Sequence, residues 1–545
     1  MLTVKNLSHL AKVFPDKIFG CGVSKMEGAK NQELSYQIAL EGEGEYALEI
    51  CSTLPSLKIY KVGYVYSGLP IYEPDKDEGY LTRAPGYFPD VLLPFDGKIK
   101  LEKGKNESIW ITIPEGAPVG NHLISAIFHG ADGDFVGEAV SIKIRDIFLP
   151  RQYLYFTQWV HYDCIASAHG VEIFSEEHWA LIEKYVRLAV EHGMNMLLTP
   201  VLTPPLDTEV GSERPTVQLV DITVLENGDY SFDFSRLARF VKMARDCGIE
   251  HFEINHLFTQ WGAEHAPKVM ATVNGEYKKI FGWETDALEG EYPRFLEQLI
   301  PSLIYALTSL GVDRGDIFFH ISDEPSEEHA KSYHRAGRWV MPLILGCNQI
   351  DAISSYDTFK KVVIVSPVVG IDHIEPFNRA NVPNLWGYYC CAQWTEVSNR
   401  FLDMPSARNR IIGTQIFKYD LVGFLHWGYN FYYTQLSKRR ELNPYEETDA
   451  GGAFPSGDAF SVYPLKNDVA PSIRQKVFKY ALDDARLLSL VEAKIGTLST
   501  HRLINGLAGM DVTFKNYPTD EAFFDNLVRG AFDILEEKII PEEIL

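Results

Sequence analysis

The sequence of 545 residues contains no apolar run long enough to cross a membrane. Its N-terminus, MLTVKNLSHL, lacks the continuous apolar core of a signal peptide. Basic residues are scarce: 51 lysines and arginines face 74 aspartates and glutamates, which gives a net charge of −23. Nucleic acids and anionic membranes attract basic surfaces, so we expect neither as a partner. A neutral sugar is compatible with this charge.

Cysteine is also scarce. The seven cysteines are odd in number and irregularly spaced, so they do not form a disulfide framework. Free thiols favour a reducing compartment. We therefore predict a cytoplasmic protein, or a secreted one if a leader has been removed.

Several catalytic signatures are absent. The sequence has no G-x-S-x-G elbow, and no glycine-rich phosphate loop follows any predicted strand. The nearest approach to a metal motif, His251-x-Glu253-x-x-His256, is not H-E-x-x-H, and on a strand its two histidines point to opposite faces. We predict no cofactor and no metal, with a metal at these histidines as the weaker alternative.

Residues 1–148 read as an all-β domain. Short alternating segments separated by turn residues predict a β-sandwich. These segments are Leu34–Leu40, Tyr46–Ser52, Leu57–Tyr66, Ser108–Pro114, His122–His129 and Ala139–Ile147. The proline-rich stretch Tyr72–Pro94 predicts an ordered loop rather than a strand, and we expect its Tyr80, Tyr87 and Asp90 to reach the neighbouring domain.

Residues 149–490 alternate between strand and helix patterns. The strand candidates are Tyr153–Val160, Asn195–Thr199, Glu250–Ile254, Ile317–Ser322, Ala352–Ser355, Val362–Val365, Leu385–Tyr389 and Phe424–Trp427. The helix candidates are Glu176–His192, Phe234–Cys247, Pro293–Leu310, Ser326–Leu345, Ile371–Ala380, Ser406–Tyr419 and Ser472–Leu490. This alternation predicts an α/β fold, a (β/α)₈ TIM-type barrel preceded by the β-sandwich, with a doubly wound sheet as the alternative.

The remaining residues, 491–545, include a further amphipathic segment, Thr519–Lys538. We expect these residues to form a helical extension packed on the outside of the barrel.

The fourth predicted strand carries the strongest chemical signal. It runs from Ile317 through apolar residues and ends in two adjacent carboxylates, Asp323 and Glu324, before Pro325. The carboxyl ends of barrel strands are where such folds keep their chemistry. Alternatively, the two carboxylates only complement the positive end of the following helix.

Aromatic and polar residues occur at the ends of other predicted strands. Rings stack on the C–H faces of a sugar and polar groups read its hydroxyls, so we predict a sugar-binding pocket around the carboxylates. The candidate substrate-binding residues are Trp159, His256, Tyr356, Tyr388, Trp394, Trp427 and Asn430. For any single aromatic residue, a place in the barrel core is the alternative.

Several motifs together resemble glycoside hydrolase family 123 and its relatives with a domain of unknown function. They are HISDEP at 320–325, GFLHWGYNF at 423–431, Gly457-Asp458, Tyr463-Pro464, the stretch from Pro471 to Asp484, and WITIP at 110–114 with Gly120. Ala459 and the residues after Ile473-Arg474 depart from the family's pattern. The resemblance implies a retaining β-N-acetylgalactosaminidase that works through substrate assistance.

The chemistry of a 2-acetamido sugar fits an adjacent carboxylate pair. The sugar's own amide oxygen attacks C1, which removes the need for a protein nucleophile. Asp323 then accepts a hydrogen bond from the acetamido N–H, and Glu324 protonates the leaving oxygen. We expect an ionised Asp323 to keep Glu324 protonated. Because successive strand residues face opposite ways, we also expect the backbone to kink at this pair.

Two other functions stay open. An ordinary retaining glycosidase would use Glu253 as a nucleophile with Glu324, and a barrel that has lost turnover would only bind carbohydrate. In each case the expected partner is a glycan or glycolipid.

Overall fold

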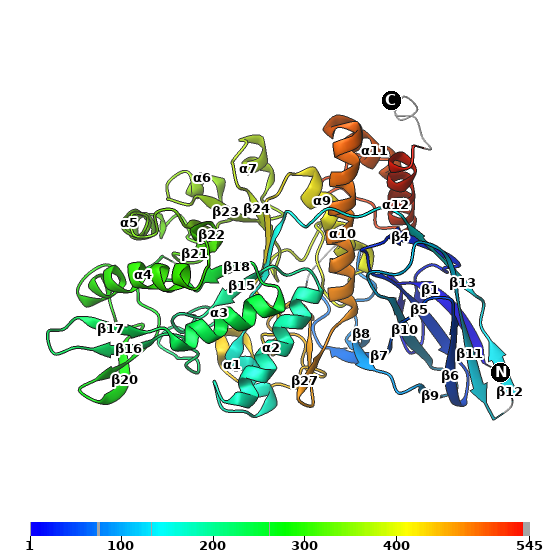
Figure 1. Ribbon diagram of the computed structural model, residues 1–545, viewed down its shortest axis with the longest axis horizontal. Coiled ribbons are helices and arrows are strands. Elements are labelled where there is room, and N and C mark those ends of the chain that lie inside the picture. Colours follow the sequence, from blue (N-terminus) through cyan, green and yellow to red (C-terminus); the bar gives the residue numbers. More distant parts are fainter. Residues whose placement is uncertain (1, 74–76, 132, 261, 538–545) are drawn as a thin grey trace.

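The computed structural model describes residues 2–73, 77–131, 133–260 and 262–537 (Figure 1). Two predicted segments reach beyond them: Pro74 of the predicted loop and Lys538 of the last predicted helix lie outside the described residues. The chain forms a pair of β-sheets, then an eight-stranded barrel, then C-terminal helices. Among the described residues, no helix has the length and apolar character needed to cross a membrane.

The N-terminal region packs two sheets face to face. One has the order β1 (Thr3–Ser8), β5 (Leu34–Glu41), β10 (Asn106–Ile113), β7 (Lys58–Ser67) and β8 (Gly86–Pro94). The other has the order β4 (Lys25–Ala29), β13 (Val140–Arg145), β11 (Gly120–Gly130), β6 (Gly44–Ser52) and β9 (Lys98–Leu101), with β12 (Gly133–Val136) beside β11. A short hairpin, β2 (Lys12–Val13) and β3 (Ile18–Phe19), forms a separate two-stranded sheet. Alternate residues such as Ile38, Ile109 and Phe128 meet in a common core, which confirms the predicted sandwich.

Strand β8 corrects the prediction of a loop over Tyr72–Pro94. Its residues Gly86–Pro94 pair with β7, with a register shift between Gly63 and Tyr64. Proline is tolerated in β8 because this strand lies at the edge of its sheet, where a missing N–H need not interrupt the ladder. The prolines therefore marked an edge strand rather than the absence of a strand.

The barrel has eight parallel strands, as predicted. They are β14 (Tyr155–Gln158), β15 (Met196–Thr199), β18 (His251–Ile254), β21 (Ile317–Phe319), β22 (Asn348–Ala352), β23 (Ser366–Gly370), β24 (Trp386–Tyr388) and β25 (Gly423–His426). Their order in the sheet is β14-β25-β24-β23-β22-β21-β18-β15. Asn195 links the two end strands: its backbone N–H donates to the carbonyl of Phe156 at 3.2 Å, and its side-chain oxygen accepts from the Phe156 N–H at 2.8 Å.

Helices surround this barrel (Figure 1). They are α1 (Tyr162–His169), α2 (Glu176–Glu191), α3 (Ser235–Cys247), α4 (Glu291–Ser309), α5 (Ala330–Val340), α6 (Tyr356–Phe359), α7 (Glu375–Arg379), α8 (Ser406–Arg410), α9 (Ile412–Lys418) and α10 (Ile473–Ile495). A four-stranded sheet that the sequence did not predict is inserted among them. It comprises β16 (Asp221–Val224), β17 (Tyr230–Asp233), β19 (Val269–Val273) and β20 (Glu276–Phe281).

The fifth and sixth strands begin elsewhere than predicted. The fifth was expected at Ala352–Ser355, but β22 occupies Asn348–Ala352, where polar residues such as Asp351 are buried and hydrogen bonded. The sixth was expected at the apolar run Val362–Val365, but β23 begins at Ser366. The sixth prediction followed the apolar run Val362–Val365, whereas the two observed strands contain polar residues or proline.

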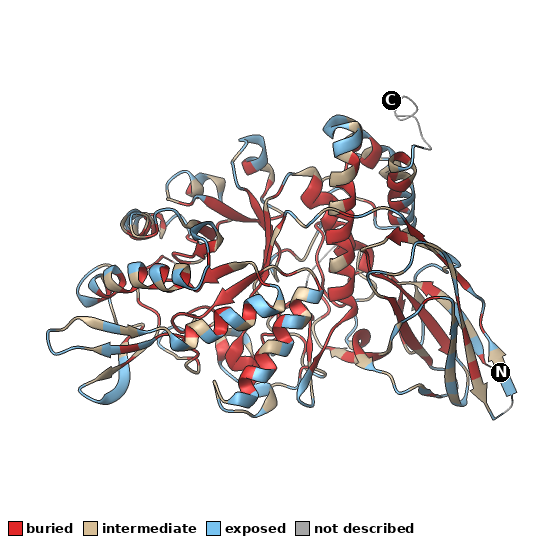
Figure 2. Ribbon diagram, viewed as in Figure 1, coloured by how far each residue is buried: buried red, intermediate tan, exposed pale blue. Residues whose placement is uncertain are grey.

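Helix α10 lies between the barrel and the sandwich, and Figure 2 shows it buried along much of its length. On one side Phe478 stacks on Phe156 of the barrel, with ring centroids 4.7 Å apart. On the other side the hydroxyl of Tyr480 lies 2.6 Å from the Ser35 hydroxyl of the sandwich. The helix thus continues the predicted segment Ser472–Leu490 to Ile495 and joins both halves of the molecule.

Helices α11 (Thr497–Ala508) and α12 (Glu521–Leu535) follow α10. Lys418 of α9 donates to Asn505 of α11 at 2.9 Å, and Arg145 of the sandwich donates to Glu536, just after α12, at 2.6 Å. The C-terminal helices therefore contact both the barrel helices and the sandwich. The three-part division at residues 148 and 490 stays a prediction.

The segment before and within β8 reaches the barrel through the three residues singled out from the sequence. The Tyr80 hydroxyl donates to the Trp394 carbonyl at 2.5 Å, and the Tyr87 hydroxyl donates to Glu446 at 3.1 Å. Asp90 is fully buried and accepts from the Nε of Arg474 at 3.0 Å. Asp90 and Arg474 therefore form an ion pair inside the protein. The hydroxyl of Tyr463 also donates to Asp90, at 2.6 Å.

Replacing Asp90 by asparagine tests this buried ion pair. We expect Asp90→Asn to lower the free energy of unfolding by about 3–5 kcal/mol, because the Arg474 guanidinium would remain buried without its counter-charge. Urea unfolding followed by tryptophan fluorescence measures the change. Asp146→Asn is the matched control, since the Asp146–Lys30 pair is exposed and should be worth at most about 1 kcal/mol. Equal losses in the two variants would contradict the expectation.

Candidate active site

The carboxylate pair lies on a sharp bend beyond the end of β21. Regular strand geometry ends at Phe319, and Glu324 has a left-handed backbone with φ of 38°. A non-glycine residue in that region costs on the order of 1–3 kcal/mol, and such strain clusters at functional sites. The bend separates the two side chains: Asp323 is half-buried and Glu324 is exposed. The kink expected from the sequence is present.

Two other strands contribute to the surroundings of Glu324. Tyr388, the last residue of β24, donates its hydroxyl hydrogen to Oε1 of Glu324. The same hydroxyl lies 3.2 Å from Oγ of Ser354, just after β22. Burial, with the Glu324 carboxylate, raises the pKa of Tyr388 well above its ordinary value, so the phenol remains a donor. The predicted neighbours Glu324 and Tyr388 are therefore in contact at the carboxyl ends of the strands.

The surroundings of Asp323 disfavour its ionised form. Burial raises the pKa of Asp323 well above its ordinary value, and the carboxylates of Glu324 and Asp207 raise it further. The sequence led us to expect an ionised Asp323, so the direction of this pKa shift differs from that expectation. A ligand that offers an N–H or a positive charge would favour the ionised form of Asp323.

Asp207 is a carboxylate that the sequence did not single out. It lies in the long loop after β15, with φ of 51°. Burial raises the pKa of Asp207 to about 6, against the opposing effect of Arg214. The only local signal was the preceding pair Pro204-Pro205, which indicates a turn but not its position beside Asp323.

Trp427 follows β25 and is half-buried. It packs against the same apolar cluster that contains Tyr388 and Trp159. Its indole Nε1 donates to Oδ2 of Asp458 at 3.0 Å, which fixes the plane of the ring. Asp458 is fully buried, and burial raises its pKa to about 7. The sequence drew attention to Asp458 only as part of a motif.

Four of the predicted binding residues are buried: Tyr388, described above, and Trp159, His256 and Asn430. Trp159 donates from Nε1 to Glu253 at 2.7 Å and lies edge-on to His256, with ring centroids 5.3 Å apart. The Asn430 amide accepts from the His161 N–H at 2.8 Å and donates to the His161 carbonyl at 3.1 Å. In this structure Trp159, His256 and Asn430 support the end of the barrel from below rather than line an exposed surface.

The other two predicted binding residues lie on the rim. Tyr356, on α6, packs edge-on against Phe377 with centroids 5.2 Å apart. Trp394 lies beside Tyr72, with centroids 5.7 Å apart. Within the described part of the chain, the structure does not bring either ring into a hydrogen bond or ring contact with the carboxylate pair or Tyr388.

Glu253 is fully buried and accepts three hydrogen bonds. The donors are Oγ1 of Thr157 at 2.6 Å, Nε1 of Trp159 at 2.7 Å and Nε2 of His320 at 2.6 Å. A carboxylate in such surroundings is held in place and is a poor nucleophile toward a sugar. This observation weighs against Glu253 as the nucleophile of an ordinary retaining glycosidase.

The polar atoms of His256, His320 and Asp351 lie within 4.8 Å of one another, close enough to consider a metal ion. However, His320 has a carboxylate at each ring nitrogen, at 2.6 Å and 3.1 Å. The rings of His256 and His320 are also stacked, with centroids 4.2 Å and planes 20° apart, so their in-plane lone pairs run side by side rather than converge. We assign no metal to this cluster.

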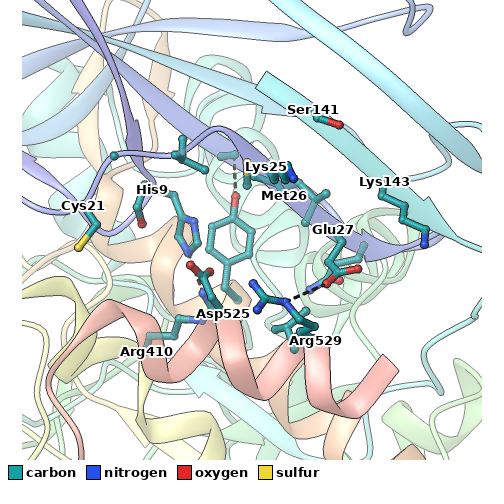
Figure 3. Close-up of a pocket in the computed structure, with 18 of the residues that line it drawn as sticks. His9, Cys21, Lys25, Met26, Glu27, Ser141, Lys143, Arg410, Asp525 and Arg529 are labelled. Carbon is teal, nitrogen blue, oxygen red and sulfur yellow. Dashed lines mark hydrogen bonds and ion pairs between the residues drawn. The ribbon is translucent and has the colours of Figure 1, made fainter. Parts of the chain in front are cut away.

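A cleft of about 580 Å³ lies elsewhere, between the sandwich and α12 (Figure 3). Its lining mixes basic and acidic groups from both sides, including Lys25, Lys143, Asp525 and Arg529. At its floor, Arg410 already pairs with Asp484 at 2.8 Å. The carboxylate pair is not among its lining residues, so the candidate active site is the barrel mouth and not this cleft.

Comparisons with known proteins identify the family of this chain. The family model described as the catalytic domain of glycoside hydrolase 123 matches residues 159–491. A comparison with curated proteins finds no match. Among solved structures, the chain is similar to a family 123 glycoside hydrolase from Clostridium perfringens, with 14% identity, a TM-score of 0.72 and 98% of each chain covered.

Weaker similarities extend to other carbohydrate-active enzymes. A β-D-glucuronidase from Dictyoglomus thermophilum has 9% identity and a TM-score of 0.33, over 88% of this chain and 97% of the other. A GH5 xyloglucanase from Bacteroides ovatus has 8% identity and a TM-score of 0.30, over 84% and 98%. The family model covers more than half of the chain and includes the carboxylate pair and the barrel strands from β15 to β25. The chain therefore belongs to glycoside hydrolase family 123.

Proposed function

We propose that this protein removes a β-linked N-acetylhexosamine, N-acetylgalactosamine in particular, by a retaining, substrate-assisted mechanism. The observation that carries the proposal is the bend at Asp323-Glu324, which presents two adjacent carboxylates in different surroundings at the barrel mouth. One is half-buried beside other carboxylates, and the other is exposed with a phenol donor. Two carboxyl groups in contrasting surroundings are suited to different roles in one reaction.

Asp323 is proposed to act on the acetamido group. The amide oxygen of the sugar attacks C1, and the ring so formed carries a positive charge. Asp323 accepts a hydrogen bond from the acetamido N–H and stabilises that positive charge. The raised pKa of Asp323 belongs to the free site, and the N–H donor and the developing charge both favour its ionised form in the complex.

Glu324 is proposed as the general acid and base. It protonates the leaving oxygen, and its carboxylate then removes a proton from the water that opens the cyclic intermediate. Its exposure gives it access to both, and the Tyr388 hydroxyl holds its Oε1 in one direction. Trp427, fixed by Asp458, is the proposed platform for the sugar ring.

The substrate class is proposed as a glycan or a glycolipid head group. The solved relative from Clostridium perfringens is described in terms of glycolipid glycan hydrolysis. The net charge of −23 is compatible with a neutral sugar. Ordinary retaining catalysis through Glu253 is less favoured because that carboxylate is buried and hydrogen bonded.

Matched aryl β-glycosides with and without the 2-acetamido group test the proposal. We expect the N-acetyl-β-galactosaminide to be hydrolysed at least about 10³-fold faster than the β-galactoside, because an internal nucleophile has a very high effective concentration. The measurement is kcat/KM for release of the aryl group from each substrate, with the α-anomer as the control. Similar rates with and without the acetamido group would rule out substrate assistance, and no hydrolysis of any glycoside would leave only carbohydrate binding.

A further inference from the structure

A buried chain of hydrogen bonds lies next to the catalytic bend. His320, three residues before Asp323, has its Nε2 2.6 Å from Oε1 of Glu253 and its Nδ1 3.1 Å from Oδ1 of Asp351. The side chain of His320 is 1% exposed and those of the two carboxylates are 0% exposed. Glu253 lies in β18 and Asp351 in β22, and His320 directly follows β21, the strand between them.

The surrounding donors indicate where the protons are. Asp351 accepts from the Ile321 N–H at 3.1 Å, from Nε2 of Gln349 at 2.8 Å and from the hydroxyl of Tyr333. Glu253 likewise accepts from Trp159 and Thr157. Carboxylates that receive so many hydrogen bonds are ionised, and an ionised carboxylate only accepts. Both ring nitrogens of His320 must then donate, which makes the ring an imidazolium.

The neighbouring charges are consistent with that state. Burial lowers the pKa of His320, but the hydrogen bonds to Asp351 and Glu253 raise it more, to about 9. His256, stacked on His320, has a pKa lowered well below its ordinary value by burial and by His320, so it stays neutral. Burial and the carboxylates of Glu324, Asp207 and Asp351 raise the pKa of Asp323, and the positive charge of His320 opposes that rise.

The same network fixes the backbone. The ladder of β21 ends at Phe319, and Asp351 then binds both the His320 ring and the Ile321 N–H. Asp351 thereby replaces a strand partner for the residues that lead into the bend. A displacement of the His320 ring would be transmitted to Asp323 through the two buried residues between them, Ile321 and Ser322.

We propose that His320, held as an imidazolium between Glu253 and Asp351, is a positioning residue that fixes the Asp323-Glu324 bend and promotes ionisation of Asp323. This role rests on the proposed function for its catalytic consequence. The charged state of His320 does not, because it follows from the hydrogen bonds of the free protein.

The charged state is tested without substrate. In ¹⁵N-histidine-labelled protein at pH 8, we expect one ring whose two nitrogens both carry slowly exchanging protons, and His320→Gln should remove that signal. Exposed His129, which also lies between two carboxylates, would exchange rapidly and is thereby distinguished. The absence of a protected, doubly protonated ring in the wild type would overturn the proposal, whether or not the variant folds.

The positioning role is tested by pH–rate profiles of His320→Gln on the glycoside that the wild type hydrolyses best. Loss of the positive charge raises the pKa of Asp323, so the acid limb of kcat/KM should move up by about one pH unit. We also expect kcat to fall by about 10–100-fold with little change in KM, because the ring acts on the bend through Asp351 and the Ile321 N–H and does not contact the sugar.

His192→Gln is the matched control. His192 is also a buried histidine, but its Nδ1 lies 2.7 Å from a backbone carbonyl, that of Leu188, rather than from a carboxylate. Its profile should keep the wild-type acid limb. An unshifted acid limb in folded His320→Gln would overturn the positioning role. A shifted limb on substrates that lack the acetamido group would instead retain the role and count against the proposed function.

Discussion

Glu324→Gln is expected to lower kcat on substrates with poor leaving groups by about 10²–10⁴-fold. The amide preserves the shape of the side chain and can still contact the Tyr388 hydroxyl. It cannot transfer a proton to the leaving oxygen. An aryl glycoside with an activated leaving group needs little protonation, so its first step should be much less affected. The measurement is kcat for a series of aryl leaving groups of increasing basicity, in which the variant should show the steeper dependence.

Glu327→Gln provides the control for this series. Glu327 lies three residues further on, is exposed, and pairs with Lys361 at the surface. Its replacement should leave the leaving-group dependence unchanged. If Glu324→Gln slows activated and unactivated substrates equally, Glu324 is not the general acid, and its exposed carboxylate would have some other role at the mouth.

The fold could be predicted to the extent that burial leaves a pattern in the sequence. Strand β21 was found because it is buried and apolar, with three β-favouring residues in succession. The predicted position of β22 was wrong because its buried residues include Gln349 and Asp351, which contact Val365 and His320 elsewhere in the chain. The local sequence pattern shows the periodicity of apolar side chains. It does not show that a polar residue is buried and hydrogen bonded to a donor far away in the sequence.

The candidate site could be predicted only in part for a related reason. Asp323 and Glu324 were identifiable because they follow a barrel strand directly, where the chain enters the mouth. Asp207 and Asp458 lie in long loops, so nothing local to them indicates which part of the mouth they reach. Asn430 also follows a strand, yet it is fully buried. Position after a strand therefore predicts the end of the barrel but not the depth of a side chain within it.

The second large effect is expected at Asp323. Asp323→Asn keeps the size of the side chain but removes the charge that would stabilise the cyclic, oxazolinium-like transition state. Loss of one such electrostatic partner costs about 10²–10³-fold in kcat. Substrate affinity should change much less, because the positive charge that Asp323 opposes develops only during the reaction. Steady-state kcat and KM on the N-acetyl-β-galactosaminide measure both.

Inhibitor binding separates this role of Asp323 from a general structural one. A thiazoline analogue of the sugar resembles the cyclised intermediate and should bind the wild type tightly but Asp323→Asn weakly. The simple N-acetylhexosamine product should bind both forms with similar affinity, because it has no ring charge to stabilise. Parallel losses for both ligands would indicate that the substitution has damaged the pocket rather than removed a transition-state interaction.

The same residue decides between the two retaining mechanisms. If the acetamido group is the nucleophile, a 2-fluoro sugar, which lacks that group, should leave no covalent adduct on the protein. If the protein supplies the nucleophile, the 2-fluoro sugar should accumulate as an adduct on a carboxylate, and Glu253 is the residue to locate by peptide mass. Glu253 would have to give up its hydrogen bonds to Thr157, Trp159 and His320 to react, so we expect no adduct there. An adduct on Glu253 would make the acetamido group a bystander and replace the substrate-assisted mechanism with the ordinary one.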